Sequence, residues 1–473
     1  MKYWKEFIFF ASYLIILLIC KAPDISSNFM GFDTLSLFYS CKFLEVRYPV
    51  PLYILLGYPL TNLPFGTDGG NLVFLSIISA FISSILVFLT IKNMTDNKIA
   101  PWIGAAALMG SYIYFSQSII VNKYTYISVF PSFMLYFYSK RKYAWSGFFA
   151  GLAMVSHYVG GFIPVMAFFC YSKELRKIWY IPIVTFLIIF LGFYIFAPKF
   201  YWDAENIDVI TRFLSPLLEV FRNITVSWFT DPRALGLLVV SFGLTLIPMA
   251  LFVIKSFNKS SPYLFILLLP VISYITGDEF RFFTFTPYVP FYAVMAGLGV
   301  VYVQTKYLSR IILIFSFLMM LSMPFVLNAN SIEENPTTLR DCINQLNIAE
   351  DESIILSVKI ADYKDGIISD VTSGHIFPMI EYYNRTNGKD LVPMSIVTTD
   401  EIIINKLKSH GVNISAFDWS SVERANDESV WHWDERRYER GIRSVCDANP
   451  NKHIYYYKLL NLVDGKSQLV KVQ

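Results

Sequence analysis

The feature that most constrains this chain is the series of long apolar runs in its first 330 residues. A helix needs about 20 apolar residues to cross the roughly 30 Å hydrocarbon core of a membrane. Runs near this length recur along the chain, and they predict spans at residues 7–20, 71–91, 99–116, 124–138, 178–197, 234–254, 262–276, 284–303 and 309–327. The sequence therefore predicts a polytopic α-helical membrane protein.

Two apolar stretches need separate interpretation. The stretch 144–171 is long for one span and short for two, and Gly160-Gly161 interrupts it. We predict two short helices that meet at these glycines, which gives about 10 or 11 membrane helices in total. The first run could also be a signal peptide, but no small-residue cleavage site follows Cys20, so we predict an anchor helix.

Charge divides the chain into two parts. Only 16% of the residues are charged, against about 25% in ordinary globular domains. Residues 1–330 carry a net charge of +9, whereas residues 331–473 carry −6 and read as a soluble segment. We therefore predict a transmembrane domain at 1–330, with a long loop at 21–70, and a soluble domain at 331–473.

The basic residues of the first part lie in short loops between apolar runs, where they set membrane topology and do not indicate nucleic-acid binding. With the N-terminus inside, the inner loops are 1–6, 92–98, 139–143, 172–177, 255–261 and 304–310, which are rich in Lys and Arg. This arrangement predicts a multi-pass protein of the cell membrane, with loop 21–70 and the C-terminal domain outside.

The outer domain has mixed patterns. Strand-like runs occur at 353–358, 453–460 and 468–472, and helix-like stretches at 337–347, 376–384 and 399–409, so we predict an α/β fold. No Gly-rich phosphate loop follows a strand, and no pair of His or Cys has metal-ligand spacing, so we predict no cofactor and no metal. Cys342 and Cys446 could form a disulfide in an oxidising compartment, or they could be two unrelated buried thiols.

Several motifs carry a family resemblance. FDTLSLFYSC, PLYILLGYPLTNLPFG and NLVFLSIISAF flank and form the first outer loop, and FSQSIIVNKYTY, GLAMVSHYVGGFIPV, FRFFTFTPYVPFYAVMAGLG and HIFPMIEYYNRTNGKDLVPM follow. Together they resemble the GT-C glycosyltransferases, nearest to the prokaryotic group related to protein O-mannosyltransferases. The resemblance implies a hexosyltransferase that uses a sugar linked to a membrane polyprenyl phosphate. Its acceptor would be a glycan, a lipid or a protein.

Two positions depart from that pattern. The family usually has a second acid three residues after the first, where this chain has Ser36. It also has a Glu where this chain has Asn122. These changes count against the family's acceptor class, or against any role that needs two carboxylates or a divalent metal.

The resemblance and the topology together suggest site residues. Asp33 matches the family's acidic position beyond the first span and would be the general base, because an attacking hydroxyl must lose a proton; alternatively it is solvated or caps a helix. A phosphate leaving group needs cations, for which Arg281, Arg47 and Lys42 are candidates. Arg281 could instead pair with Asp278 or Glu279. His157 and Tyr53 complete the predicted substrate site, although a lone His is commonly structural.

Two other functions fit a polytopic chain. A transporter or lipid-carrier flippase would have internal repeats and interrupted helices at corresponding positions of two halves, and the sequence lacks such symmetry. A non-catalytic membrane scaffold would not need Asp33 or Arg281. We therefore expect a glycosyltransferase, and the sequence does not specify its sugar or its acceptor.

Overall fold

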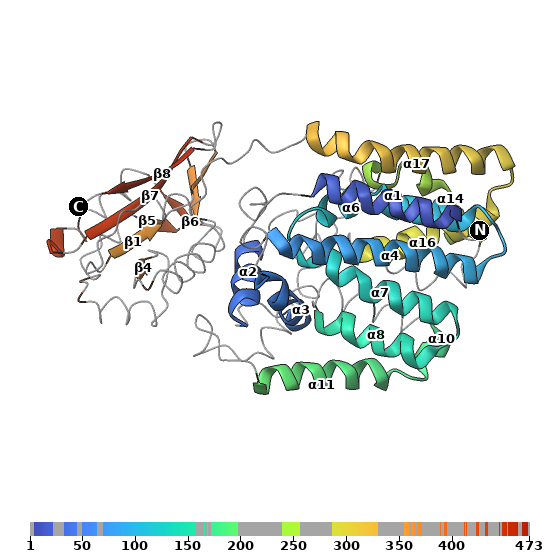
Figure 1. Ribbon diagram of the computed structural model, residues 1–473, viewed down its shortest axis with the longest axis horizontal. Coiled ribbons are helices and arrows are strands. Elements are labelled where there is room, and N and C mark those ends of the chain that lie inside the picture. The colour runs from blue at the N-terminus through green and yellow to red at the C-terminus, as the bar shows by residue number, and fades with distance from the viewer. Residues whose placement is uncertain are drawn as a thin grey trace. The chain divides into compact units, whose positions relative to one another are not determined.

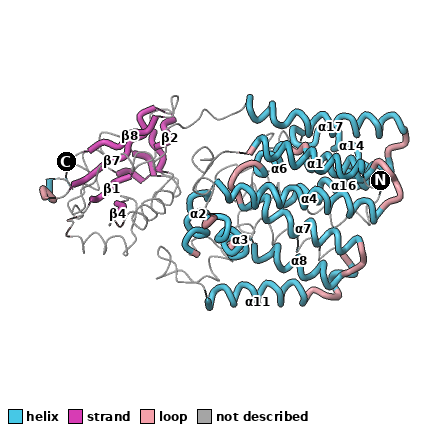
Figure 2. Tube along the Cα trace, in the orientation of Figure 1, coloured by secondary structure: helices cyan, strands magenta, loops and turns pink. Residues whose placement is uncertain are grey.

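The computed structural model describes most helices of the first 330 residues and a set of strands near the C-terminus (Figures 1 and 2). The described ranges are 4–21, 33–44, 50–63, 70–156, 172–196, 239–255 and 286–329, with Val165, Phe168, and the strands and a few single residues after 353. The chain divides into two compact units, one of Met1–Ile25 and Ser40–Asn330, the other of Ser26–Tyr39 and Ser331–Gln473.

The first unit is built from helices that correspond to the apolar runs. These are α1 (Trp4–Cys20), α4 (Val73–Met94), α7 (Lys123–Ser139), α8 (Tyr143–Ser156), α11 (Tyr180–Phe196) and α17 (Lys306–Ala329), with the short α10 (Lys173–Arg176) before α11. Helix α4 is central, since it contacts α1, α5, α7 and α16 (Figure 1). Helix α7 packs on α8, and α8 packs on α11, so this part of the bundle follows chain order.

Within the described residues, two helices are long and apolar enough to cross a membrane, Val73–Met94 and Lys306–Leu327. Shorter apolar helices occur at Ala100–Met109, Tyr180–Gly192 and Val239–Lys255. Helix α17 exposes a row of large apolar side chains, among them Ile311, Leu318 and Phe325. Such a surface suits lipid contact, because lipid tails are as apolar as these side chains.

Three predicted spans differ from the observed helices. The run 99–116 forms two helices, α5 (Ala100–Met109) and α6 (Tyr112–Ser118), because α5 ends at Gly110. The run 234–254 contains a 3₁₀ turn, η5 (Gly243–Thr245), before α14 (Leu246–Lys255). The run 284–303 contains α16 (Val289–Gly299) and the 3₁₀ turn η7 (Val300–Tyr302). The run 262–276 lies outside the described residues, as does the Gly160-Gly161 junction.

Small residues let α5 and α16 cross closely. A Cβ on Gly104 of α5 would lie 2.8 Å from the Ala293 carbonyl oxygen, and a Cβ on Gly297 of α16 would lie 2.9 Å from the Ala100 carbonyl oxygen. Close backbone approach at small residues is typical of helix pairs in membranes. The core of the bundle is therefore set partly by glycine and alanine positions that hydropathy does not identify.

The loop 21–70 contains two further helices, α2 (Asp33–Phe43) and α3 (Pro51–Thr61), and the 3₁₀ turn η2 (Gly70–Leu72). Helix α3 has 11 residues, which gives a length of about 16 Å, so it is too short to cross the hydrocarbon core. This agrees with the prediction that residues 51–66 belong to the long loop 21–70 and not to a span.

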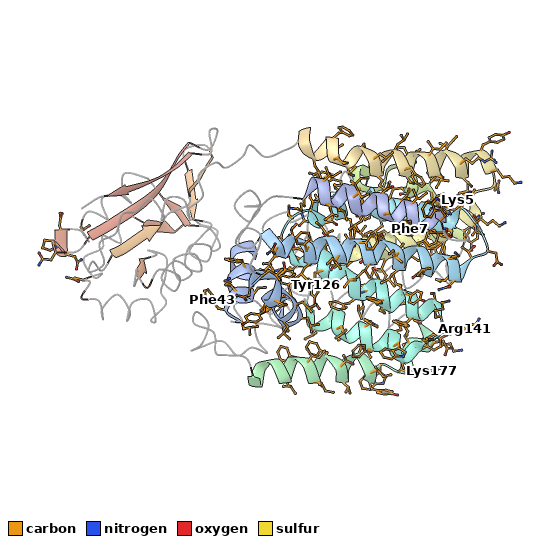
Figure 3. All side chains as sticks on the ribbon, in the orientation of Figure 1. Lys5, Phe7, Phe43, Tyr126, Arg141 and Lys177 are labelled. Carbon is orange, nitrogen blue, oxygen red and sulfur yellow. The ribbon has the colours of Figure 1, made fainter. Side chains whose placement is uncertain are left out.

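The two ends of the bundle differ in charge. In Figure 3, Lys5, Arg141 and Lys177 lie at one end, and Phe43 and Tyr126 lie at the opposite end. The first end carries most of the described basic loops, with Lys92 paired to Glu6 at 3.5 Å and Lys177 paired to Glu174 at 2.9 Å. The first unit is therefore polarised along its helix axes.

The described residues of the second unit form two four-stranded sheets. The first has the order β4-β1-β7-β8, formed by β4 (Val392–Met394), β1 (Ile354–Val358), β7 (His453–Asn461) and β8 (Lys466–Lys471). Strand β1 runs parallel to β4 and β7, and β8 runs antiparallel to β7. The second sheet is antiparallel, with the order β2-β3-β6-β5: Ala361–Lys364, Ile367–Asp370, Trp431–Trp433 and Val422–Arg424.

The strands β1, β7 and β8 occupy the three ranges where strands were predicted. The helices predicted at 337–347, 376–384 and 399–409 lie outside the described residues, as do Cys342 and Cys446. The described part of the second unit therefore consists mainly of strands, and its α/β class remains a prediction.

Candidate active site

Helices α2 and α3 pack tightly against each other at Cys41 and Gly57. A Cβ on Gly57 would overlap the Cys41 Sγ and would lie 3.0 Å from the Leu72 side chain. The Cys41 thiol is buried and donates to the Tyr53 carbonyl oxygen at 3.8 Å. Burial raises the pKa of this thiol well above its usual range, so Cys41 is a neutral packing group.

Lys42 fastens the end of α2 to the end of α3. Its Nζ donates a hydrogen bond to the Thr61 carbonyl oxygen at 2.9 Å, and Asn71 Nδ2 donates to the Leu60 carbonyl oxygen at 3.2 Å. These two bonds satisfy carbonyl groups that the end of a helix leaves without an intrahelical partner. One donor of the Lys42 ammonium is therefore used structurally, and an ammonium has three.

Tyr53 of α3 lies in the core between α3 and α7. It has 0% exposure, and its ring meets the Tyr126 ring edge-on, with centroids 5.4 Å apart and an interplanar angle of 82°. Burial, followed by the proximity of Cys41 and Tyr126, raises the pKa of the Tyr53 hydroxyl well above its usual value. Tyr53 is therefore a neutral hydroxyl, able to donate a hydrogen bond but not to serve as a base near neutral pH.

The start of α7 is a polar junction. The Asn122 side chain caps α7 by accepting a hydrogen bond from the Tyr124 N–H at 2.9 Å, and its amide nitrogen donates to Gln117 Oε1 of α6. Ser76 of α4 donates to the Asn122 carbonyl oxygen at 3.0 Å. Where the family resemblance leads one to expect a Glu, this chain thus has an amide that closes the N-terminus of a helix.

Lys123 follows directly and is the residue of this region that sequence analysis missed. It is the first residue of α7, has 0% exposure, and its Nζ lies 5.2 Å from the centroid of the Tyr124 ring. Burying an ammonium is costly, and the helix N-terminus adds an unfavourable dipole. The available signal was a lysine that starts an apolar, tyrosine-rich run within a motif already noted, FSQSIIVNKYTY.

The structure describes three of the six predicted site residues. Asp33 is the first residue of α2, and Lys42 is the second-to-last residue of the same helix. Tyr53 lies on α3. Lys42 and Tyr53 both lie at the packed α2–α3 pair. Arg47, His157 and Arg281 lie outside the described residues. Among the described residues, no group of three or more His, Cys, Asp or Glu could hold a metal ion.

A family model for dolichyl-phosphate-mannose-protein mannosyltransferases matches residues 49–202. The matched segment begins just before α3 and includes Tyr53, the polar junction and α8. A comparison with curated proteins found no match.

Solved structures give a match over most of the chain. ArnT from Cupriavidus metallidurans bound to undecaprenyl phosphate aligns with a TM-score of 0.55 and 12% identity, covering 92% of this chain and 98% of ArnT. The apo structure of the same protein aligns with the same TM-score and identity, covering 87% and 89%. These comparisons confirm the resemblance that the motifs indicated: the chain has the fold of the GT-C membrane glycosyltransferases.

Proposed function

We propose that this protein is a GT-C glycosyltransferase that moves a sugar from a polyprenyl-phosphate-linked donor to an acceptor at the outer face of the cell membrane. The observation that carries the proposal is the alignment of 92% of the chain with ArnT bound to undecaprenyl phosphate. The mannosyltransferase family model matches residues 49–202 and supports the same activity from the sequence alone. The transferred sugar would be a hexose, and the acceptor a glycan, a lipid or a protein.

In this proposal Asp33 is the general base. The acceptor oxygen attacks the anomeric carbon, the bond to the donor phosphate breaks, and the acceptor proton passes to the carboxylate. The position of Asp33 in the sequence supports this role, because the residue begins α2 and follows the first predicted span, which ends at Cys20.

The departing phosphate gains negative charge, so the proposed site includes cations. Arg281 and Arg47 would hold the phosphate, since a guanidinium can donate to two of its oxygens. Lys42 keeps donors beyond the one bound to Thr61, and His157 and Tyr53 would contact the sugar or the lipid phosphate. No resident metal or cofactor is part of the proposal.

The proposed orientation places the N-terminus inside, and α2, α3 and the domain 331–473 outside. The polarity of the bundle supports it, because Lys5, Arg141 and Lys177 gather at the end opposite Phe43 (Figure 3). Basic loops stay on the cytoplasmic side of membranes. The transmembrane domain would comprise residues 1–330 with about 10 or 11 helices, and the outer domain would be α/β in class.

The decisive experiment is sugar transfer by the full chain in reconstituted vesicles, with a radiolabelled polyprenyl-phosphate sugar and a membrane extract as the acceptor source. Transfer by the parent and its loss in Asp33→Asn would support the enzyme. A flippase would move the lipid carrier across the bilayer without transfer, and Asp33→Asn would not affect that movement. A scaffold would do neither.

A further inference from the structure

A basic patch lies where two turns of the bundle meet. One turn joins α7 to α8, and the other runs through α10 to the start of α11. We define the basic patch by five exposed cations of these turns: Arg141, Lys142, Lys173, Arg176 and Lys177. Glu174 is the one acid within the two turns, and it pairs with Lys177 at 2.9 Å. The patch therefore carries an excess of positive charge.

The two turns lie side by side because α8 packs closely on α11. A Cβ on Gly147 of α8 would lie 3.1 Å from the Ile181 side chain and 3.5 Å from the Ile178 side chain. Arg141 and Lys177 lie at the same end of the bundle (Figure 3). Cations from both turns can therefore act on one ligand.

Exposed aromatic and apolar side chains continue from the patch along the bundle. Trp145 of α8, Trp179 and Tyr180 are each more than half exposed. Trp and Tyr are enriched where a membrane meets water. Beyond them α11 exposes Val184 and Leu191. The helix from Tyr180 to Leu191 is about 16 Å long, close to half of the roughly 30 Å hydrocarbon core. This surface therefore has the depth of one leaflet.

Arg141 occupies a backbone position that favours glycine. Its φ is 59°, and α7 ends in two hydrogen bonds, from the Lys142 N–H to the Phe137 carbonyl oxygen and from the Arg141 N–H to the Tyr138 carbonyl oxygen, both at 2.9 Å. Glycine is the usual residue at the left-handed position of this helix-ending motif, because it has no Cβ. An arginine held there against that preference indicates a use for its charge.

We infer that the basic patch binds the headgroup of an anionic phospholipid, in the leaflet opposite the proposed active site. The cations would donate to the lipid phosphate, and an acyl chain would follow the exposed side of α11. Trp145 and Trp179 would lie at the level of the headgroups. A membrane lipid fits better than a soluble polyanion, because the aromatic and apolar surface continues directly from the patch. This inference goes beyond the proposed function and does not depend on sugar transfer.

The test measures how closely phosphatidylglycerol approaches Trp145 and Trp179. The full chain is reconstituted in phosphatidylcholine vesicles that contain phosphatidylglycerol with brominated acyl chains, which quench nearby tryptophans. Brominated phosphatidylcholine gives the reference. Subtracting the signal of the variant Trp145→Phe/Trp179→Phe isolates these two rings from the other tryptophans of the chain.

Two variants weaken the patch, and two matched controls remove the same charge elsewhere. The variants are Arg141→Gly and Arg141→Gly/Arg176→Gln. The controls are Lys306→Gln and Lys306→Gln/Arg310→Gln, at exposed positions of α17. The controls separate binding at the patch from a general effect of net charge.

We expect the parent to take phosphatidylglycerol in preference to phosphatidylcholine. Arg141→Gly should lower that preference about fivefold, because a cation near an anionic membrane surface contributes about that factor. The double variant should lower it further, and both controls should match the parent. The melting temperature of Arg141→Gly should equal or exceed that of the parent, because glycine suits the left-handed position. Weaker lipid binding would therefore not reflect a loss of folding.

Cations that only set membrane orientation give a different result. The preference for phosphatidylglycerol would then be the same in Arg141→Gly as in the parent, or the controls would lower it equally, and either result would overturn the inference. Displacement of the lipid by inorganic phosphate would mean that the patch takes a soluble anion, and would also overturn it. A chain that transfers no sugar would defeat the proposed function and leave the lipid measurement unaffected.

Discussion

The Lys42 ammonium lies 2.9 Å from the Thr61 carbonyl oxygen and so joins α2, which begins at Asp33, to α3, which carries Tyr53. The proposed base and a proposed substrate contact are thus on two helices linked by a charged hydrogen bond. The link is partly buried, which makes it stronger than an exposed ion pair. The joining of the end of α2 to α3 therefore depends on a residue that sequence analysis assigned to phosphate binding.

Replacing Lys42 tests this link. Lys42→Met keeps the aliphatic stem and removes the hydrogen bond, so we expect a loss of about 1 kcal/mol in stability. The measurement is thermal unfolding of the full chain in detergent, with Lys140→Met, at an exposed lysine of the α7–α8 turn, as control. If Lys42 also binds the donor phosphate, the Michaelis constant for the donor rises beyond what the lost folded fraction explains.

The contact between Gly57 and Cys41 predicts an unusual response to alanine. Alanine in a helix interior is normally better than glycine by roughly 0.5–1 kcal/mol. Here the new Cβ meets the Cys41 Sγ, and such overpacking costs about 1–3 kcal/mol, so we expect Gly57→Ala to be destabilising. Thermal unfolding of Gly57→Ala, Cys41→Ala and the double variant forms the measurement.

Cys41→Ala should partly rescue Gly57→Ala, because it removes the sulfur and leaves the Cys41 Cβ, 3.1 Å from the added methyl. Additive effects in the double variant would show that the two helices are not in contact at this point.

The role of Asp33 is tested by replacing its side-chain carboxylate with an amide. Asp33→Asn keeps the shape of the side chain but cannot accept the acceptor's proton, so we expect sugar transfer to fall by roughly two orders of magnitude or more. Undecaprenyl phosphate binding and the melting temperature should remain at parental values. Transfer by Asp33→Asn within a few-fold of the parent would remove Asp33 from the mechanism.

Arg281 makes a prediction that separates phosphate recognition from a local ion pair. We expect Arg281→Lys to weaken donor use measurably and Arg281→Ala to weaken it severely, because lysine keeps the charge but loses the two-pronged donor. Donor titrations of the transfer rate give the comparison. If Arg281 only pairs with Asp278 or Glu279, replacing both acids would mimic Arg281→Ala, and lysine would substitute well.

The proposed topology can be checked by labelling from outside the cell. A cysteine at Asp68, in loop 21–70, and one at Ser415, in the C-terminal part, should both react with an impermeant maleimide. A cysteine at the exposed Lys142, in the turn between α7 and α8, should react only after permeabilisation. Native Cys41 should stay unlabelled because it is buried and its pKa is raised. Labelling at only one of the two outer positions would contradict the orientation.

The sequence by itself determined the parts of this protein that depend on local composition. Runs of apolar residues locate α1, α4, α7, α11 and α17, because a membrane helix must bury its backbone in about 20 apolar residues. The basic loops also distinguish the two ends of the bundle, because membrane orientation depends on the Lys and Arg residues near each helix end, which are read directly from the sequence. The motifs around Asp33 indicated a resemblance to GT-C glycosyltransferases, and the structural match to ArnT shows the same fold.

Only the tertiary structure decided the features that depend on distant segments. Hydropathy could not show that α17 packs closely on Gly110, where α5 ends: a Cβ there would lie 2.9 Å from the Met320 backbone nitrogen, more than 200 positions away. Nor could it show that Lys123 is buried, since burial depends on which helices cover the start of α7. The pairing of Tyr53 with Tyr126 joins residues far apart in the chain, so packing, not local pattern, brings these two hydroxyl-bearing rings together.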